Sequence, residues 1–287
     1  REMKALSRSI QGLYERYIKE LVDLQVVDKD RATNKKYLLE MAETWQARLR
    51  AGERSRTLYK ALSVQAKAVK VEHAIDLVET QGMSALRAYL DRLREEAASD
   101  AGSKASREIV SSEHFQRLYE EAKAVKAEHP KLSRVMGVVA RQLTEHPDSR
   151  ILVFTHYRDT CDLVASKLGK VEGARVAKLV GQSDRKGERG LRQREQVGVL
   201  QRFRDGEFNV LVATSVGEEG LDVASTDLVV FYEPVPSEIR SIQRRGRTGR
   251  SRAGNVVIMI TKGTRDEAYY YSSLNKEKAM RRRLRTM

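Results

Sequence analysis

The chain has 287 residues, which is enough for two ordinary domains that each bury a core. Lysine and arginine outnumber aspartate and glutamate by 54 to 40, and the net charge of +14 suits a polyanionic partner. Hydrophobic residues at 40% argue against disorder, no apolar run approaches the roughly 20 residues of a membrane span, and a single cysteine excludes a disulfide framework. The chain begins with arginine, and we expect it to be part of a longer protein.

The first part of the chain has the pattern of long helices. All four prolines lie at or beyond position 130, and proline inside a helix costs about 3 kcal/mol. Apolar residues recur at steps of three and four in two stretches. They are Leu6, Ile10, Leu13, Tyr17, Leu21 and Leu24 in the first, and Leu38, Met41, Ala42, Trp45 and Leu49 in the second. The periodicity predicts two helices, with Trp45 in the core.

Capping residues set the predicted ends of the next helices. Thr33 is a candidate cap for the second helix, a third runs from Thr57 to Thr80 and stops at Gly82, and Ser84 caps a fourth. We expect a surface loop over Ser99–Ser106 and further helices over Glu113–Ala127 and Lys131–Leu143. The pattern predicts an all-helical domain over residues 1–130.

After Pro147 the pattern changes to short apolar runs separated by polar stretches of helical length. The runs are Ile151–Phe154, Val210–Val212, Leu228–Phe231 and Val256–Ile260. Uninterrupted apolar strands that alternate with helices are typical of a parallel sheet covered on both faces. We therefore predict an α/β domain over residues 131–287. Cys161 is expected to be a buried residue of one of its helices.

The segment Gln243–Arg250 (QRRGRTGR) carries the strongest chemical signal. Arg247 and Arg250 are three residues apart, with glycine between them, so their guanidinium groups lie on one side of a helical turn. Guanidinium is permanently charged and binds phosphate oxygens with two hydrogen bonds, and two such groups suit a nucleotide γ-phosphate. The spacing resembles motif VI of superfamily 2 helicases.

Other motifs of these helicases follow in the same order. The segment Ile151–Tyr157 resembles motif IV, Val180–Gln182 resembles the nucleic-acid-contacting turn after it, and Val212–Ser215 with Glu218–Asp222 resembles motif V. Hydroxyl and amide groups at strand ends can meet a phosphate backbone. The candidate nucleic-acid-binding residues are Thr155, His156, Gly181, Gln182, Thr214 and Ser215. Gly220 would allow close approach to the nucleotide, and Asp222 would accept hydrogen bonds from its ribose.

The run from Val180 to Arg250, followed by the stretch that ends in Tyr269–Tyr271, resembles the archaeal Hef helicases. These are related to the FANCM proteins and, more distantly, to the RIG-I-like RNA helicases. His73–Ala74, Glu79–Gly82 and Glu128–Leu132 are also similar to stretches of that group. The resemblance implies a second RecA-like domain preceded by a helical insert, in an ATP-driven DNA helicase that remodels forked or branched DNA.

The resemblance also assigns roles. It implies that Arg247 and Arg250 act as arginine fingers on ATP while Gln243 positions the phosphates and the water. It implies that basic residues of the insert clasp duplex arms, namely Lys35, Lys36, Arg48, Arg50, Lys67 and Lys70. The partner would be forked or branched DNA, without a membrane. A sliding clamp or a nuclease as a further partner is not readable from the residues.

The chain departs from the family in one respect. It contains no Gly-x-x-x-x-Gly-Lys-Ser/Thr segment, so the phosphate cradle and the ligands of Mg²⁺ are expected in a first RecA-like domain outside this chain. Asp266–Tyr269 imitates a metal-binding DEAH box, but it follows motif VI instead of an early apolar strand, and we interpret it as the start of a helix. We expect no metal site in this chain, and no ATP hydrolysis by it alone.

Two alternatives remain open. A RIG-I-like double-stranded RNA translocase shares the motif set and also carries a helical insert. The other is a non-catalytic module that binds branched nucleic acid, in which no part of the whole protein would carry a phosphate-binding loop. The expected location is the cytoplasm, near the nucleoid, or the nucleus in a eukaryote. Tyr269–Tyr271 is expected to pack against the domain more readily than to stack on bases.

Overall fold

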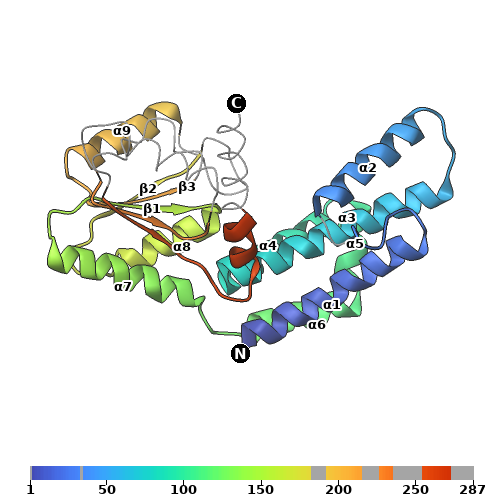
Figure 1. Cartoon of the computed structure of the whole chain (residues 1–287), viewed down its shortest axis with the longest axis horizontal. Coiled ribbons are helices and arrows are strands. Elements are labelled where there is room, and N and C mark those ends of the chain that lie inside the picture. Colours follow the sequence, from blue (N-terminus) through green and yellow to red (C-terminus); the bar gives the residue numbers. More distant parts are fainter. Residues whose placement is uncertain (1, 33–34, 182–191, 215–225, 235–253, 273–287) are drawn as a thin grey trace, which may run out of the picture. The chain divides into compact units, whose positions relative to one another are not determined.

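The structure is a computed structural model in which residues 2–32, 35–181, 192–214, 226–234 and 254–272 are described (Figure 1). Its contacts divide the chain into two compact units, Arg1–Ala127 and Glu128–Met287. We call them the helical unit and the sheet unit. In the described parts of the chain, no helix combines the length and the apolar character that crossing a membrane requires.

The helical unit contains helices only, as predicted. They are α1 (Glu2–Asp23), α2 (Lys35–Arg50), α3 (Arg56–Asp76), η1 (Leu77–Gln81), α4 (Met83–Ala98), α5 (Lys104–Val110) and α6 (Glu113–Ala124). Their apolar faces form one core, in which Trp45 is 1% exposed. The prediction that Trp45 is a core residue is confirmed.

Two local predictions need correction, and a third falls on a residue that is not described. The third helix is α-helical only to Asp76 and continues as the π-helical turn η1, because Gly82, at a φ of +99°, closes it by donating its N–H to the Leu77 carbonyl at 2.8 Å. Gly82 also occupies the cap position of α4, so Ser84 lies inside that helix and does not cap it. Thr33 lies outside the described residues.

The predicted loop over Ser99–Ser106 is a loop only in its first part. Helix α5 begins at Lys104, and the hydroxyl of Ser103 caps it by accepting the N–H of Ser106 at 3.2 Å. Serine favours loops and helix caps for the same reason, its short hydroxyl, so composition alone does not separate the two.

The sheet unit holds a five-stranded parallel sheet in the order β2-β3-β1-β4-β5. The strands are β1 (Ile151–Thr155), β2 (Val176–Leu179), β3 (Val210–Thr214), β4 (Leu228–Phe231) and β5 (Asn255–Ile258). This confirms the α/β RecA-like domain after an all-helical one. Strand β2 was not predicted, because its Lys178 interrupts the apolar run with an exposed side chain.

Helices cover both faces of the sheet. Figure 1 shows α7 (Pro130–Glu145) and α8 (Arg158–Leu168) below it and α9 (Gln193–Arg204) above it. Alternate strand residues serve two cores: Ile151 and Val153 pack with α7 and α8, whereas Leu152 and Phe154 pack with α9. Cys161 is fully buried on α8, as predicted.

One polar network joins three helices of the helical unit. Lys70 of α3 donates to both carboxylate oxygens of Glu96 on α4, at 2.9 and 3.2 Å, and the hydroxyl of Ser103 donates to the same carboxylate at 2.8 Å. Burial by itself raises the pKa of Glu96, but the hydrogen bonds from Lys70, Ser106 and Ser103 outweigh it and lower this pKa to about 2. The network therefore favours ionised Glu96.

This network predicts a pH dependence of the stability of the helical unit. Because the folded-state pKa of Glu96 is lowered from 4.5 to about 2, its contribution to stability is complete above pH 4.5 and is lost as the pH falls toward 2. In Glu96→Gln, the free energy of unfolding should be lower at neutral pH and should fall less steeply over that window. Trp45, the single tryptophan, provides the fluorescence signal. Glu43→Gln, at an exposed position of α2, is the matched control and should behave as wild type.

Candidate nucleic-acid and nucleotide site

The carboxyl ends of the parallel strands form the candidate site. Strand β1 ends at Thr155 and β3 at Thr214, and these two residues are register partners in adjacent strands. Ligands of open parallel sheets bind beside this edge. Of the predicted site residues, Thr155, His156, Gly181 and Thr214 are described and follow or end such strands. Outside the described residues lie Gln182, Ser215, Gly220, Asp222, Gln243, Arg247 and Arg250.

The two threonines are buried at this edge. Thr155 is 2% exposed and Thr214 is 4% exposed. The Thr155 hydroxyl donates to the Tyr157 carbonyl at 3.4 Å, whereas the Thr214 hydroxyl has no hydrogen-bond partner among the described residues. The hydroxyl of Thr214 therefore retains its capacity to hydrogen-bond to a ligand at the strand end. The direct contact of either threonine with nucleic acid stays a prediction.

His156 is the exposed member of the set, and Glu233 holds its backbone. Its N–H donates to the carboxylate of Glu233, which lies beyond the end of β4 and is 7% exposed. The rings of His156 and Tyr157 meet edge to face, with centroids 4.8 Å apart. The turn after β1 is therefore anchored to the end of β4, with the imidazole free to face solvent. The sequence analysis did not identify Glu233 as a site residue. The signal that could have identified it is a carboxylate shortly after an apolar strand.

The turn after β2 is held in a similar way. The guanidinium of Arg158, at the start of α8, donates to the carbonyl of Gly181, and Arg158 is 8% exposed. The side chain of Gln196 on α9 donates to the Val180 carbonyl at 3.0 Å. Both contacts use backbone carbonyls of the predicted nucleic-acid-contacting turn. Sequence analysis missed Arg158, because its partner is a backbone group that no residue pattern reveals.

A buried ion pair lies in the same unit. Lys131 of α7 pairs with Asp266, and their side chains are 4% and 0% exposed. Lys131 also lies over the ring of Tyr232 at 5.3 Å, and the N–H of Thr261 donates to Asp266 at 3.0 Å. Burial raises the pKa of Asp266 even with this ammonium beside it. The pair joins the first turn of α7 to the segment after β5.

The DEAH-like string is confirmed as the start of a helix. Residues 265–272 are helical, and Asp266 is engaged by Lys131, so its carboxylate does not face a metal position. Across the described ranges, no group of three or more His, Cys, Asp or Glu side chains could hold a metal ion. Tyr269 and Tyr271 are 44% and 56% exposed, so the expectation that this tyrosine run packs against the domain is wrong for these two.

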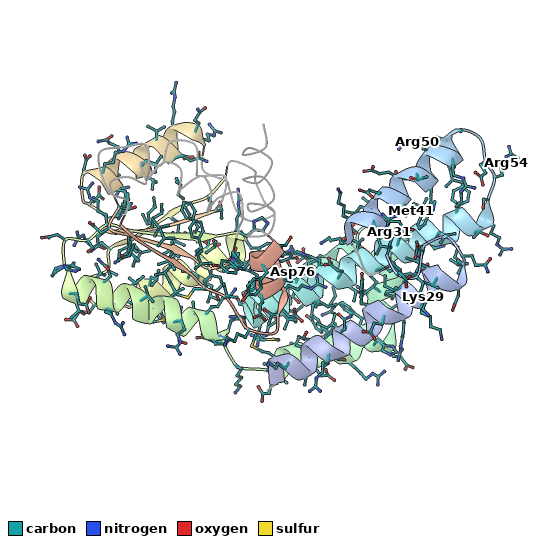
Figure 2. The ribbon with its side chains drawn as sticks, viewed as in Figure 1. Lys29, Arg31, Met41, Arg50, Arg54 and Asp76 are labelled. Carbon is teal, nitrogen blue, oxygen red and sulfur yellow. The ribbon has the colours of Figure 1, made fainter. Side chains whose placement is uncertain are left out.

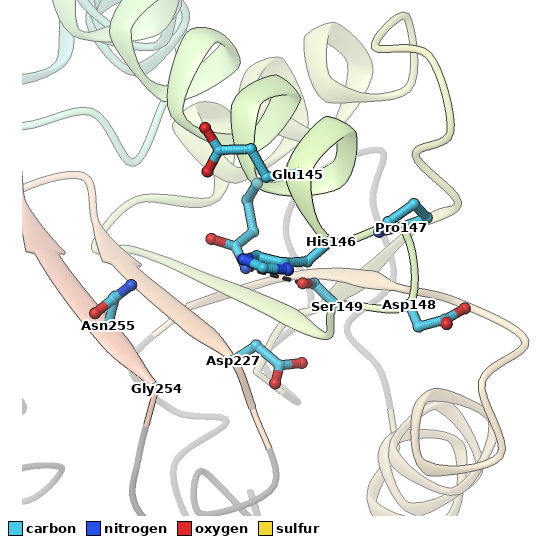
Figure 3. Close-up of a pocket in the computed structure, with 9 residues that line it drawn as sticks. Glu145, His146, Pro147, Asp148, Ser149, Asp227, Gly254 and Asn255 are labelled. Carbon is cyan, nitrogen blue, oxygen red and sulfur yellow. Dashed lines mark hydrogen bonds between the residues drawn. The ribbon is translucent and has the colours of Figure 1, made fainter.

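A cavity of about 660 Å³ lies at the opposite edge of the sheet (Figure 3). It is lined by the end of α7 and by residues that precede β1, β4 and β5, including Ser149, Asp227 and Asn255. Gln142 donates to the Ser149 hydroxyl at 2.8 Å across it. Since none of the predicted site residues lines this cavity, its size does not make it the candidate site.

Most of the basic residues expected to clasp DNA form ion pairs. Lys35 pairs with Glu72 at 2.6 Å, and Lys67 pairs with Glu108 at 2.8 Å. The remaining pairs are Lys36–Glu40, Arg48–Glu53 and Lys70–Glu96. Among these six residues, Arg50 alone makes no ion pair, and it is exposed at the end of α2 (Figure 2). The carboxylates weaken the field of the other five, so the structure does not support them equally as phosphate contacts.

Two family models match adjacent parts of the chain. The helicase conserved C-terminal domain matches residues 131–252. A model described as the helical bundle of an ATP-dependent RNA helicase matches residues 2–131.

Individual relatives agree with these matches. A protein named as an ATP-dependent RNA helicase of Methanocaldococcus jannaschii is 41% identical over 80% of this chain, and the DNA helicase mph1 of Aspergillus terreus is 36% identical over 72%. The chain spans 28% and 20% of these two proteins. The crystal structure of the Pyrococcus furiosus Hef helicase domain matches 95% of this chain and 55% of its own, with 42% identity and a TM-score of 0.76. The predicted resemblance to Hef is confirmed.

The buried ion pair yields a prediction about the sheet unit. Lys131→Met leaves the Asp266 carboxylate without its counter-ion, which should cost about 3–5 kcal/mol of unfolding free energy. The double variant with Asp266→Leu removes both charges and should recover a large part of that loss. Urea unfolding followed by far-UV circular dichroism gives these values, and Trp45 fluorescence reports the helical unit separately. A loss below about 1 kcal/mol in the single variant would show that the pair is not a structural requirement.

Proposed function

The chain belongs to the helicase family, and we propose that it is the helical insert and second motor domain of an ATP-dependent DNA helicase that remodels forked or branched DNA. The observation that carries this proposal is the match to the Hef helicase domain over 95% of the chain, which includes the helical unit as well as the sheet unit. The fungal relatives named as DNA helicases support the same substrate.

Helicases of this family use ATP with Mg²⁺. The carboxyl edge of the sheet suits a nucleotide, because parallel sheets bind phosphates there. In the whole enzyme this edge would face a first motor domain that supplies the phosphate cradle and the Mg²⁺ ligands. Gly220 and Asp222 would contact the nucleoside, and Gln243 would position the phosphates and water. Bound ATP supplies the energy for translocation.

Arg247 and Arg250 would stabilise the negative charge that develops on the transferred phosphoryl group, because guanidinium stays charged at every working pH.

The nucleic-acid strand would lie along the same edge. His156 offers an exposed imidazole, while Thr155, Gly181, Gln182, Thr214 and Ser215 hold the strand by its backbone. Glu233 and Arg158 would act as positioning residues, since each fixes a turn of this path.

A second candidate is an RNA translocase. It is favoured by the names of the archaeal relative and of the helical-bundle model, both of which specify an RNA helicase. Binding to matched DNA forks and RNA duplexes separates the two, because an RNA enzyme would read 2′-hydroxyl groups and the A-form groove. Binding without any ATP hydrolysis by the whole protein would support the non-catalytic module instead.

The arginine-finger role gives a prediction for the whole enzyme. Arg247→Ala or Arg250→Ala should lower kcat for ATP hydrolysis by roughly 10³-fold, with DNA affinity nearly unchanged. The 287-residue chain alone should hydrolyse no ATP above background, because it contains no Gly-x-x-x-x-Gly-Lys-Ser/Thr segment. Steady-state hydrolysis and fork binding are measured on the same preparations. Loss of DNA binding with hydrolysis intact would instead make these arginines contacts of the nucleic-acid backbone.

The helical unit gives a second prediction. Motor domains hold one strand by its backbone and distinguish a fork poorly from a tailed duplex, so preference for branches requires another surface. The 287-residue chain should bind forked or four-way DNA more tightly than linear duplex, with affinity that falls steeply as salt rises. A truncated chain over 128–287 should lose the preference. If it discriminates equally well, the helical unit only braces the motor domain.

A further inference from the structure

The connection between α2 and α3 is a tightly held turn. Gly52, at a φ of +96°, donates its N–H to the Leu49 carbonyl at 3.1 Å, as at helix ends where glycine takes the left-handed region. The guanidinium of Arg48 makes two hydrogen bonds to Glu53, at 2.7 and 2.8 Å, and Ser55 caps α3 by accepting the N–H of Leu58 at 3.3 Å. Several contacts therefore fix the positions of the side chains that this turn presents.

Residues 48–60, which we call the hairpin tip, are strongly basic. They include five basic residues and one acidic residue. Arg48 and Lys60 pair with Glu53 and Glu20, but Arg50, Arg54 and Arg56 are exposed, with no ion pair in the described structure. Figure 2 shows Arg50 and Arg54 at the end of the α2–α3 hairpin. The N-terminus of α3 adds its partial positive charge at the same place.

An exposed aromatic ring lies among these arginines. Tyr59 is 62% exposed, although it lies one position beyond the buried Leu58 on α3. It is three residues after Arg56, so the two side chains share a face of the helix. A single exposed aromatic ring is too small an apolar surface for a stable protein interface, but it matches the face of one nucleobase.

We propose that the hairpin tip binds the branch point of a nucleic-acid junction, with the ring of Tyr59 stacked on the base at the end of the duplex and Arg50, Arg54 and Arg56 on the flanking phosphates. This proposal rests on the proposed function, and it names the part of the helical unit that meets the junction. Guanidinium groups bind phosphate oxygens with two hydrogen bonds, and a preformed turn loses little freedom on binding.

The test uses the 287-residue chain and forked DNA with 2-aminopurine in the last base pair of the duplex at the junction. Wild type and Tyr59→Phe, which keeps the ring, should alter the fluorescence on binding. Tyr59→Ala should lose this signal and bind the fork roughly tenfold more weakly, with unchanged affinity for linear duplex. Leu39→Ala, at another exposed apolar side chain of the same unit, is the matched control and should behave as wild type.

The triple variant Arg50→Ala, Arg54→Ala, Arg56→Ala tests the binding of these arginines to phosphates. Its slope of log affinity against log salt on forks should become shallower by roughly 0.9 for each phosphate that the variant no longer neutralises. Two results would overturn the proposal: a salt slope of the triple variant equal to that of wild type, or a Tyr59→Ala variant with the wild-type 2-aminopurine signal and fork affinity. Neither result would contradict the preference of the chain for forks. If wild type binds forks and linear duplex equally well, the proposed recognition of branches is wrong. A 2-aminopurine signal that depends on Tyr59 would in that case still support stacking by this ring.

Discussion

Parallel pairing of β1 with both β3 and β4 is the interaction on which the candidate site depends. It aligns the carboxyl ends of three strands, so that Thr155 lies beside Thr214 and the amide of His156 reaches Glu233, 77 residues further along the chain. Without this pairing, Thr155 and Thr214 would not be neighbours. Both threonines are buried at this edge, whereas the side chain of His156 is exposed there.

In the helical unit, ion pairs between helices use part of the positive charge. Some of its lysines pair with carboxylates of neighbouring helices, as Lys35 does with Glu72 and Lys70 with Glu96, so part of its positive charge stabilises the fold. Arg50, Arg54 and Arg56 of the hairpin tip are exposed and make no ion pair in the described structure. A net positive composition therefore says little about where a polyanion binds, because ion pairing redistributes the usable charge.

Sequence patterns predicted four of the five strands of the described sheet and missed the edge strand β2. The runs that became β1, β3 and β4 are apolar on both faces, which is the signal a central parallel strand must carry, whereas the edge strand β2 has Lys178 and half-buried neighbours. Spacing and order singled out Thr155 and Thr214, which are register partners at the carboxyl edge. Glu233 and Arg158 were missed because they act on backbone groups distant in sequence, and such contacts exist only once the sheet has formed.

The names of the relatives divide between RNA and DNA helicases, and the described contacts explain why sequence similarity alone would not separate them. Arginine binds the phosphates of either polymer, and an aromatic ring stacks on any base. Neither contact reads the 2′-hydroxyl, which is the group that distinguishes the two polymers at a given site.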